Sequence, residues 1–375
     1  MDRGSASAGE RASADWLARR LSGIGAVDVR LLAFRYSRSF ATTHAAHHVA
    51  GAAGALAGGP VGAALAAGAA ASYELDFSGR RQWLRALLPA GEGTTVVGRI
   101  PAEGERRRTL VLVAHHDVAR TGLVFRLLAA GRGGAAAERR GGVRSFALPA
   151  TSGLALTAAG ALLAPRLTRL LALPLLAVQV ALMADVERSP AVPGASDNAT
   201  GVAGVLALVE EFTRRPLEGT EVLAVLPGCE ESGMGGMAAW MRHEGAQLDP
   251  LSTLVVGLDT LGAGEPAVLS GEGPARTERY PPPVLAMADR GAALAGLDPP
   301  RRWRIGGWTD PVLALQAGLP ALSIVSTRDG GFTNYHLPTD TADRVDWQSV
   351  ELSVRLAEGT ARDFARTGLR VPTSG

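Results

Sequence analysis

Apolar positions along this chain follow two spacings, and the two alternate regularly from residue 197 onward. Residues three and four apart, the period of an amphipathic helix, alternate with the short apolar runs that are typical of buried strands. The expected helices lie at 202–212, 235–243, 283–294 and 347–366, and the expected strands at 221–226, 253–258 and 321–325. This alternation predicts an α/β sandwich on a mostly parallel sheet.

The N-terminal part of the chain predicts the rest of the same domain. A helix is expected at 9–23, followed by a strand at 27–34. Two further strands, 94–100 and 109–114, are separated by turn-like residues and are expected to pair with each other. We therefore expect one domain over residues 1–375, with a mostly parallel mixed sheet sandwiched between helices.

Two apolar insertions interrupt this pattern. Residues 39–73 contain no charged side chain, are rich in Ala and Gly, and are broken by Gly58, Gly59 and Pro60. The second insertion, 120–190, contains an apolar hairpin at 146–184, whose two halves are separated by Arg166 and Arg169. Its first half is charge-free over 20 residues, about the length of a membrane span.

Each insertion is expected to form a helical hairpin, and its location remains open. The hairpins could anchor the chain in a membrane, cover one side of the sheet, cap the site or mediate oligomerisation. For residues 39–73 a membrane is the weaker alternative, because Ala and Gly span poorly and three histidines are present: His44, His47 and His48. The arginines before the second hairpin would leave the domain on the cytoplasmic side by the positive-inside rule; they are Arg132, Arg139, Arg140 and Arg144.

Composition excludes several other classes of protein. The 38 basic residues, all Arg, nearly balance 36 acidic ones, so the chain has little of the positive charge that nucleic-acid binding needs. Cys229 is the single cysteine, which excludes an intrachain disulfide and a cysteine-based zinc site. The first 25 residues are polar, so no signal peptide is expected.

Candidate catalytic and metal-binding residues lie where expected strands end. His115 and Asp117 follow one strand, Glu230 and Glu231 follow another, and Asp259 closes a third. Asp197 precedes a helix, and Tyr335 and His336 lie in a loop before the last helix. Taken singly, each motif has an ordinary structural interpretation, such as a helix cap or a solvated loop. Together, two histidines and three carboxylates at one sheet edge suit zinc, with one carboxylate bridging two ions.

In this order the motifs resemble the co-catalytic di-zinc aminopeptidases of metallopeptidase family 28. The resemblance covers residues 1–35, 94–118 and 191–366 and implies a zinc exopeptidase-like fold, two Zn²⁺ per chain and a peptide substrate with a free N-terminus. Its implied metal ligands are His115 and Asp259 at one ion, Glu231 and His336 at the other, and Asp197 between them. Its other implied roles are a general base at Glu230, a carboxylate that orients His115 at Asp117, and a phenol that polarises the scissile carbonyl at Tyr335. A strained peptide after Asp197 is also typical of the family.

The chain departs from the family pattern in two places. The bridging Asp normally follows the His-x-Asp motif closely, whereas 80 positions separate Asp117 from Asp197 here. His116 replaces an aromatic residue, and we expect it to be solvated rather than to shape the substrate pocket. Asp310 is expected to start a helix, and Asp340 and Asp343 to order the His336 loop through local hydrogen bonds.

Two other functions remain open. One is a glutaminyl cyclase, which resembles this family and uses a single zinc ion. The other is a binding module that has lost its metal; its signature would be missing ligands, and none is missing here. The preferred N-terminal residue and the oligomeric state cannot be predicted from the sequence.

Overall fold

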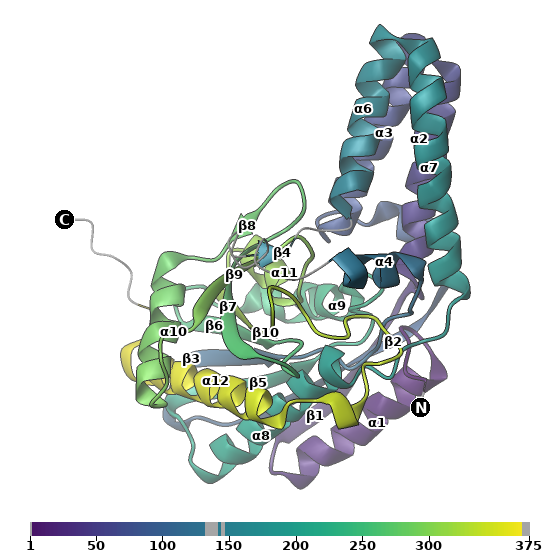
Figure 1. Ribbon diagram of the computed structural model, residues 1–375. Coiled ribbons are helices and arrows are strands. Elements are labelled where there is room, and N and C mark those ends of the chain that lie inside the picture. The colour runs from purple at the N-terminus through teal and green to yellow at the C-terminus, as the bar shows by residue number, and fades with distance from the viewer. Residues whose placement is uncertain (1, 132–141, 144–146, 370–375) are drawn as a thin grey trace, which may run out of the picture.

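The computed structural model describes residues 2–131, 142–143 and 147–369. Within these residues a ten-stranded mixed sheet has the order β1-β2-β5-β3-β6-β10-β7-β9-β4, and β8 pairs with β7 (Figure 1). The parallel centre consists of β5 (Glu218–Leu226), β3 (Glu103–Val113), β6 (Thr253–Leu258) and β10 (Ala321–Thr327). The flanking strands are β1 (Val27–Ser37), β2 (Ala90–Ile100), β7 (Glu265–Glu272), β8 (Glu278–Arg279), β9 (Arg301–Ile305) and β4 (Gly142–Val143).

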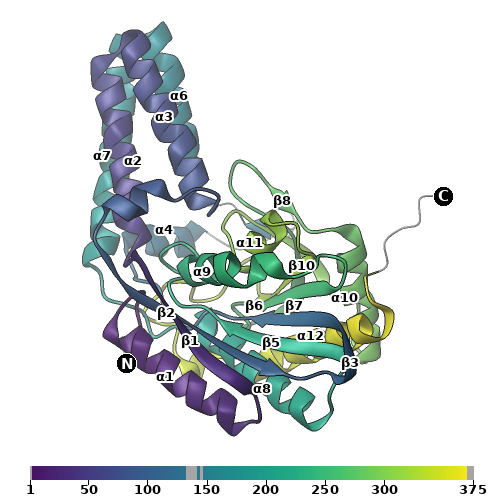
Figure 2. The same cartoon turned by 180° about the vertical axis from the view of Figure 1, so that it is seen from behind.

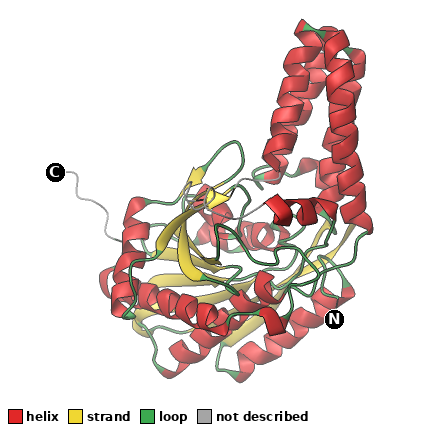
Figure 3. Cartoon of the chain, in the orientation of Figure 1, coloured by secondary structure: helices red, strands yellow, loops and turns green. Residues whose placement is uncertain are grey.

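Helices cover both faces of the sheet, so the expected sandwich is confirmed (Figures 2 and 3). One face carries α1 (Ala8–Gly23), α8 (Thr200–Arg214), α10 (Pro282–Leu294) and α12 (Trp347–Thr367). The other carries α9 (Gly235–His243) and α11 (Pro311–Gln316). Short helical turns lie at η1 (Trp83–Leu87), η3 (Gly245–Gln247) and η4 (Ala342–Arg344). Every residue of β6 is buried, as expected of a strand covered on both faces.

One strand pairing differs from the sequence-based expectation. β2 and β3 follow each other along the chain, yet β5 lies between them, antiparallel to β2 and parallel to β3. Eight of the nine residues of β5 are buried. A strand this apolar is stabilised by central burial, and this outweighs the local preference of two consecutive strands for a hairpin.

The two insertions pack together as one projecting four-helix bundle (Figures 1 and 2). Its helices are α2 (Phe40–Ala57), α3 (Gly59–Phe77), α6 (Ala147–Leu163) and α7 (Pro165–Arg188). The short helix α4 (Leu123–Gly131) contacts α7 near the base. Among the described residues, α7 is the one helix long and apolar enough to cross a membrane. Phe146, Arg132, Arg139, Arg140 and Arg144, which entered the membrane prediction, lie outside the described residues.

The second insertion leaves and rejoins the domain at one place. The Thr121 N–H donates to the Pro190 carbonyl at 3.0 Å, and the Val192 N–H donates to the Ala119 carbonyl at 2.9 Å. The 80 positions between Asp117 and Asp197 therefore form an excursion that closes on itself. Both site residues stay at the sheet edge.

A buried ion pair joins the bundle to the domain. Arg85 Nη2 lies 2.6 Å from Asp76 Oδ1, near the end of α3, and Arg85 Nε donates to both oxygens of Asp76. The same guanidinium donates to the Ser232 carbonyl, next to Glu231. The base of the bundle is thus fixed to a loop of the sheet edge.

We expect Arg85→Ala to destabilise the fold strongly, because it leaves the Asp76 carboxylate buried without a partner. The expected loss in free energy of unfolding is about 3–5 kcal/mol, measured by urea denaturation. Arg11→Ala is the matched control, because Arg11 forms an exposed pair with Asp15 and its removal should cost about 0.5 kcal/mol or less. Equal losses in the two variants would contradict the anchoring role of Arg85.

Candidate metal centre and active site

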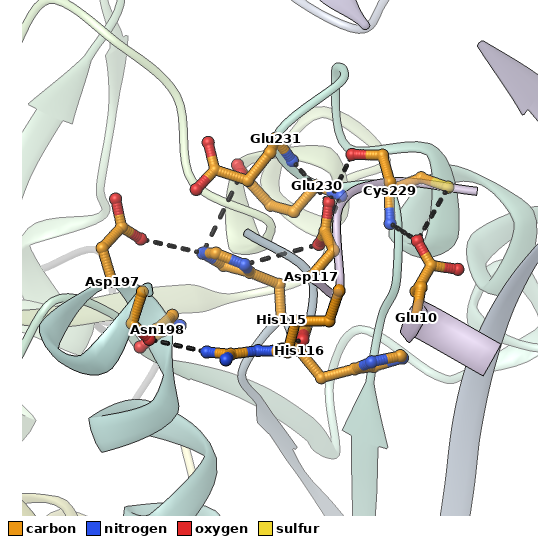
Figure 4. A network of polar contacts seen from close by, with 12 residues as sticks. Glu10, His115, His116, Asp117, Asp197, Asn198, Cys229, Glu230 and Glu231 are labelled. Atoms are coloured by element: carbon orange, nitrogen blue, oxygen red, sulfur yellow. Dashed lines mark hydrogen bonds and ion pairs between the residues drawn. The ribbon is translucent and has the colours of Figure 1, made fainter. Parts of the chain in front are cut away.

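Loops from five parts of the fold meet at the carboxyl edge of the central strands. His115 and Asp117 follow β3, Glu230 and Glu231 follow β5, and Asp259 follows β6. Asp197 lies in the turn η2 (Ala195–Ala199) before α8, and His336 in the loop between β10 and α12. The Asp197–Asn198 peptide bond is cis. Figure 4 shows His115, Asp117, Asp197, Glu230 and Glu231 converging on one point.

Asp197 lies between the two histidines. Its Oδ1 is 3.3 Å from His115 Nε2, and its Oδ2 is 3.3 Å from His336 Nε2. Glu231 Oε2 lies 3.0 Å from His336 Nε2, and Asp259 Oδ2 lies 3.9 Å from His115 Nε2. Two three-residue groups that could each hold a metal ion result, and they share Asp197: His115, Asp197 and Asp259, and Asp197, Glu231 and His336.

The donor separations fit zinc. Tetrahedral coordination with zinc–ligand bonds of about 2.0–2.2 Å places donor atoms about 3.3–3.6 Å apart, and the separations here run from 3.0 to 3.9 Å. Imidazole and carboxylate donors are ligands that zinc accepts. The third possible group, His115 with Glu230 and Glu231, overlaps the other two.

Buried negative charge explains why this site needs a cation. Burial, together with the nearby Asp197 carboxylate, raises the pKa of Glu231 to about 7 and that of Asp259 to about 6, although the neighbouring histidines lower both. Burial by itself would lower the pKa of His336, but Glu231 and Asp197 raise it to about 9. The pKa of Asp197 would rise on burial, but His115 and His336 hold it well below its usual range. The carboxylates thus compete for positive charge, which a metal ion supplies.

Glu230 has the position of a proton carrier. Its Oε2 lies 3.9 Å from His115 Nε2, and burial raises its pKa well above the usual range. Its side chain borders a pocket of about 70 Å³, whose wall includes Phe40, Trp308 and Tyr335. Tyr335 stacks its ring on His336 at a centroid distance of 3.8 Å.

Asp117 contacts not only His115 but also the backbone of the Glu230–Glu231 turn and the N-terminal segment. Its Oδ1 lies 3.5 Å from His115 Nδ1 and accepts the Glu230 N–H at 3.0 Å. Its Oδ2 accepts the Glu231 N–H at 3.2 Å and the Ser5 hydroxyl at 2.6 Å. One buried carboxylate therefore contacts His115, which is an expected metal ligand, and the backbone of both Glu230 and Glu231.

The N-terminal segment supports the site, which the sequence pattern did not reveal. The Arg3 guanidinium donates to the carbonyls of His116 and Gly194, on either side of the insertion. Glu10 is fully buried in the first turn of α1 and accepts the N–H groups of Thr94 and Cys229. Serine, arginine and glutamate at the start of a helix have no spacing that distinguishes these contacts from ordinary capping.

Two side chains, His116 and Asp340, differ from the sequence-based expectation, whereas Asp310 starts its helix as expected. His116 is buried rather than solvated, and its Nε2 lies 2.9 Å from the Thr94 carbonyl, because the residue between two inward-facing site residues points into the sheet. Asp340 accepts the N–H groups of Ser196 and Asp197 at 2.8 and 3.1 Å, so it ties the His336 loop to the bridging turn. Asp310 does precede α11, yet its buried carboxylate does not cap that helix. Neither Asp310 oxygen has a hydrogen-bond partner among the described residues, and its charge adds to the raised pKa of Glu230.

Asp340→Ala should weaken metal binding about 10–100-fold, the usual cost of removing a group that orients a ligand. The reason is that the backbone N–H groups of Ser196 and Asp197 lose their acceptor. Zinc affinity would be measured by competition with a chelator. Asp343→Ala, in the exposed turn η4, is the control and should change nothing; an unaltered affinity in Asp340→Ala would contradict this role.

No curated protein sequence matches the chain, but solved structures share its fold. A glutaminyl cyclase from Porphyromonas gingivalis is 14% identical, with a TM-score of 0.53 over 96% of this chain and 92% of that one. A leucine aminopeptidase precursor from Bacteroides thetaiotaomicron is 13% identical, with a TM-score of 0.53 over 96% and 91%. A Zn-dependent exopeptidase from Parabacteroides distasonis is 13% identical, with a TM-score of 0.53 over 98% and 92%.

These likenesses show a zinc exopeptidase-like fold, as the resemblance implied. A family model adds sequence evidence that includes four of the five expected metal ligands. Residues 178–360 match the model described as peptidase family M28. The sequence match over residues 178–360 and the shared fold together show a zinc exopeptidase-like fold of the M28 type.

Proposed function

We propose that this chain is a di-zinc aminopeptidase that removes N-terminal residues from peptides. The observation that carries the proposal is Asp197, whose two oxygens face two different histidines at the same distance, 3.3 Å. A carboxylate shared in this way is what a pair of neighbouring metal ions requires. His115 and Asp259 would hold one ion, and Glu231 and His336 the other.

Zinc bound at this site would polarise the scissile carbonyl and lower the pKa of a water molecule. Glu230 would accept the proton of the attacking water and return it to the leaving amine, acting first as a base and then as an acid. Asp117 keeps the Glu230 backbone in place during both transfers. Tyr335 would donate a hydrogen bond to the developing oxyanion, the role that the family resemblance implies.

Two pockets border the proposed base and its neighbour. The pocket of about 70 Å³ with aromatic walls touches both Glu230 and Glu231. A second pocket, of about 220 Å³, touches Glu231 from the side of the N-terminal segment and includes Ser5 and Arg38. A small pocket beside a larger one suits a substrate whose single terminal residue is separated from the rest of the peptide.

A glutaminyl cyclase is the second candidate, because cyclases share this fold as closely as aminopeptidases do. The Bacteroides thetaiotaomicron glutaminyl cyclase has a TM-score of 0.54 and the leucine aminopeptidase precursor has one of 0.53. Ligand retention favours the aminopeptidase, because both groups of donors are complete. The two candidates differ in expected metal content and in product.

Glu230→Gln should lower turnover of an aminoacyl-anilide about 10²–10⁴-fold, because glutamine cannot accept the proton. Its zinc content should match that of the parent, since Glu230 is not one of the proposed ligands. Glu265→Gln, an exposed change in β7, is the control and should keep parental turnover. Parental activity in Glu230→Gln would refute the proposed base.

Elemental analysis should find two zinc ions per purified chain, and release of the N-terminal residue should stop after chelation and return with zinc. The same samples would be offered a peptide with an N-terminal glutamine, with ammonia release as the readout. One zinc ion per chain with ammonia release would support the cyclase instead. Two zinc ions with neither hydrolysis of any terminal residue nor ammonia release would refute both activities.

A further inference from the structure

The four-helix bundle exposes large apolar side chains around its whole circumference. Leu163 and Leu170 are 81% and 70% exposed, and each of the four helices contributes further examples. They are Val49 and Leu56 on α2, Val61 and Leu65 on α3, Leu156 and Leu162 on α6, and Leu167, Leu171, Leu175 and Val178 on α7. A surface of this size is rare on a protein surrounded by water.

Many of the residues inside the bundle are small, and Tyr73, Leu154 and Leu176 are buried there with them. A Cβ on Gly54 would lie 2.7 Å from the Gly62 carbonyl oxygen, and one on Gly62 would lie 2.3 Å from the Gly54 oxygen. The backbones of α2 and α3 are therefore in direct contact, and Ala66 and Ala161 are buried. A bundle in water packs its leucines inside, whereas helices in lipid pack through small residues and leave large ones outside.

Charged residues are confined to the two ends of the bundle. No charged residue lies between Arg169 and Asp185 on α7. The two are 16 positions apart, which corresponds to about 24 Å along the helix axis. Residues 39–73 also lack charge. The hydrocarbon core of a bilayer is about 30 Å thick. Long Arg side chains at the end of a helix can extend to the membrane surface and so compensate for an apolar stretch that is a few ångströms shorter.

The three histidines within residues 39–73 face the bundle interior. His44, His47 and His48 are all buried near the base, and His47 pairs with the Thr43 carbonyl and the Ser72 hydroxyl, each at 2.8 Å. Membrane proteins place polar side chains in this way, against other helices rather than against lipid. The histidines therefore do not count against a membrane location for α2 and α3.

We propose that the bundle crosses a lipid bilayer as two helical hairpins, with Arg166 and Arg169 at the far surface. A second copy of the chain would cover one side of the bundle, whereas the apolar side chains lie on all four helices. Arginines are more numerous at the domain end, where they lie at or near the ends of three of the four helices: Arg35, Arg38, Arg80, Arg81 and Arg188. By the positive-inside rule, the catalytic domain lies on the cytoplasmic side.

The bundle also determines what the active site faces. Phe40 begins α2, Phe77 ends α3, and both line the pocket that touches Glu230. The pocket therefore opens at the membrane surface. If the proposed aminopeptidase function holds, on which this step rests, the substrates are peptides whose N-termini lie at that surface.

Vesicle flotation tests whether the bundle inserts into a lipid bilayer. The full chain, reconstituted from detergent into phosphatidylcholine–phosphatidylglycerol vesicles, should float with them and resist both high salt and alkaline carbonate. Leu171→Asp with Val178→Asp should reduce the floating fraction severalfold, since both side chains face outward, whereas Leu251→Asp on the domain surface should not. A parent chain that stays soluble without detergent, or that salt releases, overturns the proposal.

Cysteine labelling tests whether the bundle spans, and it needs no enzymatic activity. Cys229 is fully buried, so Leu163→Cys at the tip and Leu251→Cys on the domain supply single reporters. In intact cells a membrane-impermeant maleimide should label the tip and reach the domain only after lysis. Labelling of both, or of neither, in intact cells overturns the spanning arrangement.

Turnover of a lipid-anchored peptide with a free N-terminus, compared with the same peptide in solution, tests the surface placement. A preference for the anchored peptide of at least about tenfold is expected on vesicles and should disappear in detergent. Equal turnover in both settings overturns the surface placement. Correct flotation and labelling without turnover of either peptide would refute the proposed function and leave the membrane assignment intact.

Discussion

Concentrated negative charge at the end of a buried sheet is the constraint on which the rest of the site depends. Asp117, Asp197, Glu230, Glu231, Asp259 and Asp310 are carboxylates gathered around two histidines. Removing this much charge from water is unfavourable unless cations or hydrogen-bond donors offset it. The upward shifts in the pKa of Glu231 and Asp259 express that cost, and metal binding removes it by replacing protons with an ion.

Carboxylates that are not proposed ligands hold the ligands in place by accepting backbone N–H groups. Asp117 fixes the Glu230–Glu231 turn, Asp340 fixes the turn at Asp197, and Glu10 fixes the strand and loop at Thr94 and Cys229. A backbone N–H neutralises part of the charge without adding a cation that would compete for the site. The same contacts join loops that are far apart in sequence, so the ligand positions depend on the whole sheet edge.

This arrangement explains how far sequence reasoning could go. The alternating spacings predicted the sheet. His115, Glu231 and Asp259 could be expected at one edge because each follows the end of an expected strand, and parallel strands end at the same edge of a sheet. The roles of Ser5, Glu10 and Asp340 could not be predicted, because a carboxylate or hydroxyl whose hydrogen-bond partner lies 84 to 219 positions away leaves no pattern in the sequence. Asp310 was read correctly as preceding a helix, but only the fold shows that its side chain turns into the site.

The insertions were predicted as two separate hairpins because the sequence contains no sign that they meet. In the structure they form one bundle, which the fold accommodates because the second insertion closes on itself between Ala119 and Val192. An excursion with adjacent ends costs little chain entropy for its length and leaves the sheet register unchanged. Arg85 then connects the bundle to the catalytic loop, since it pairs with Asp76 and donates to the Ser232 carbonyl. Gln82 makes a second connection, because its amide donates to the carbonyls of Asp76 and Gly233. A change in the environment of the bundle would therefore reach the loop of Glu231 through these two side chains rather than through the sheet.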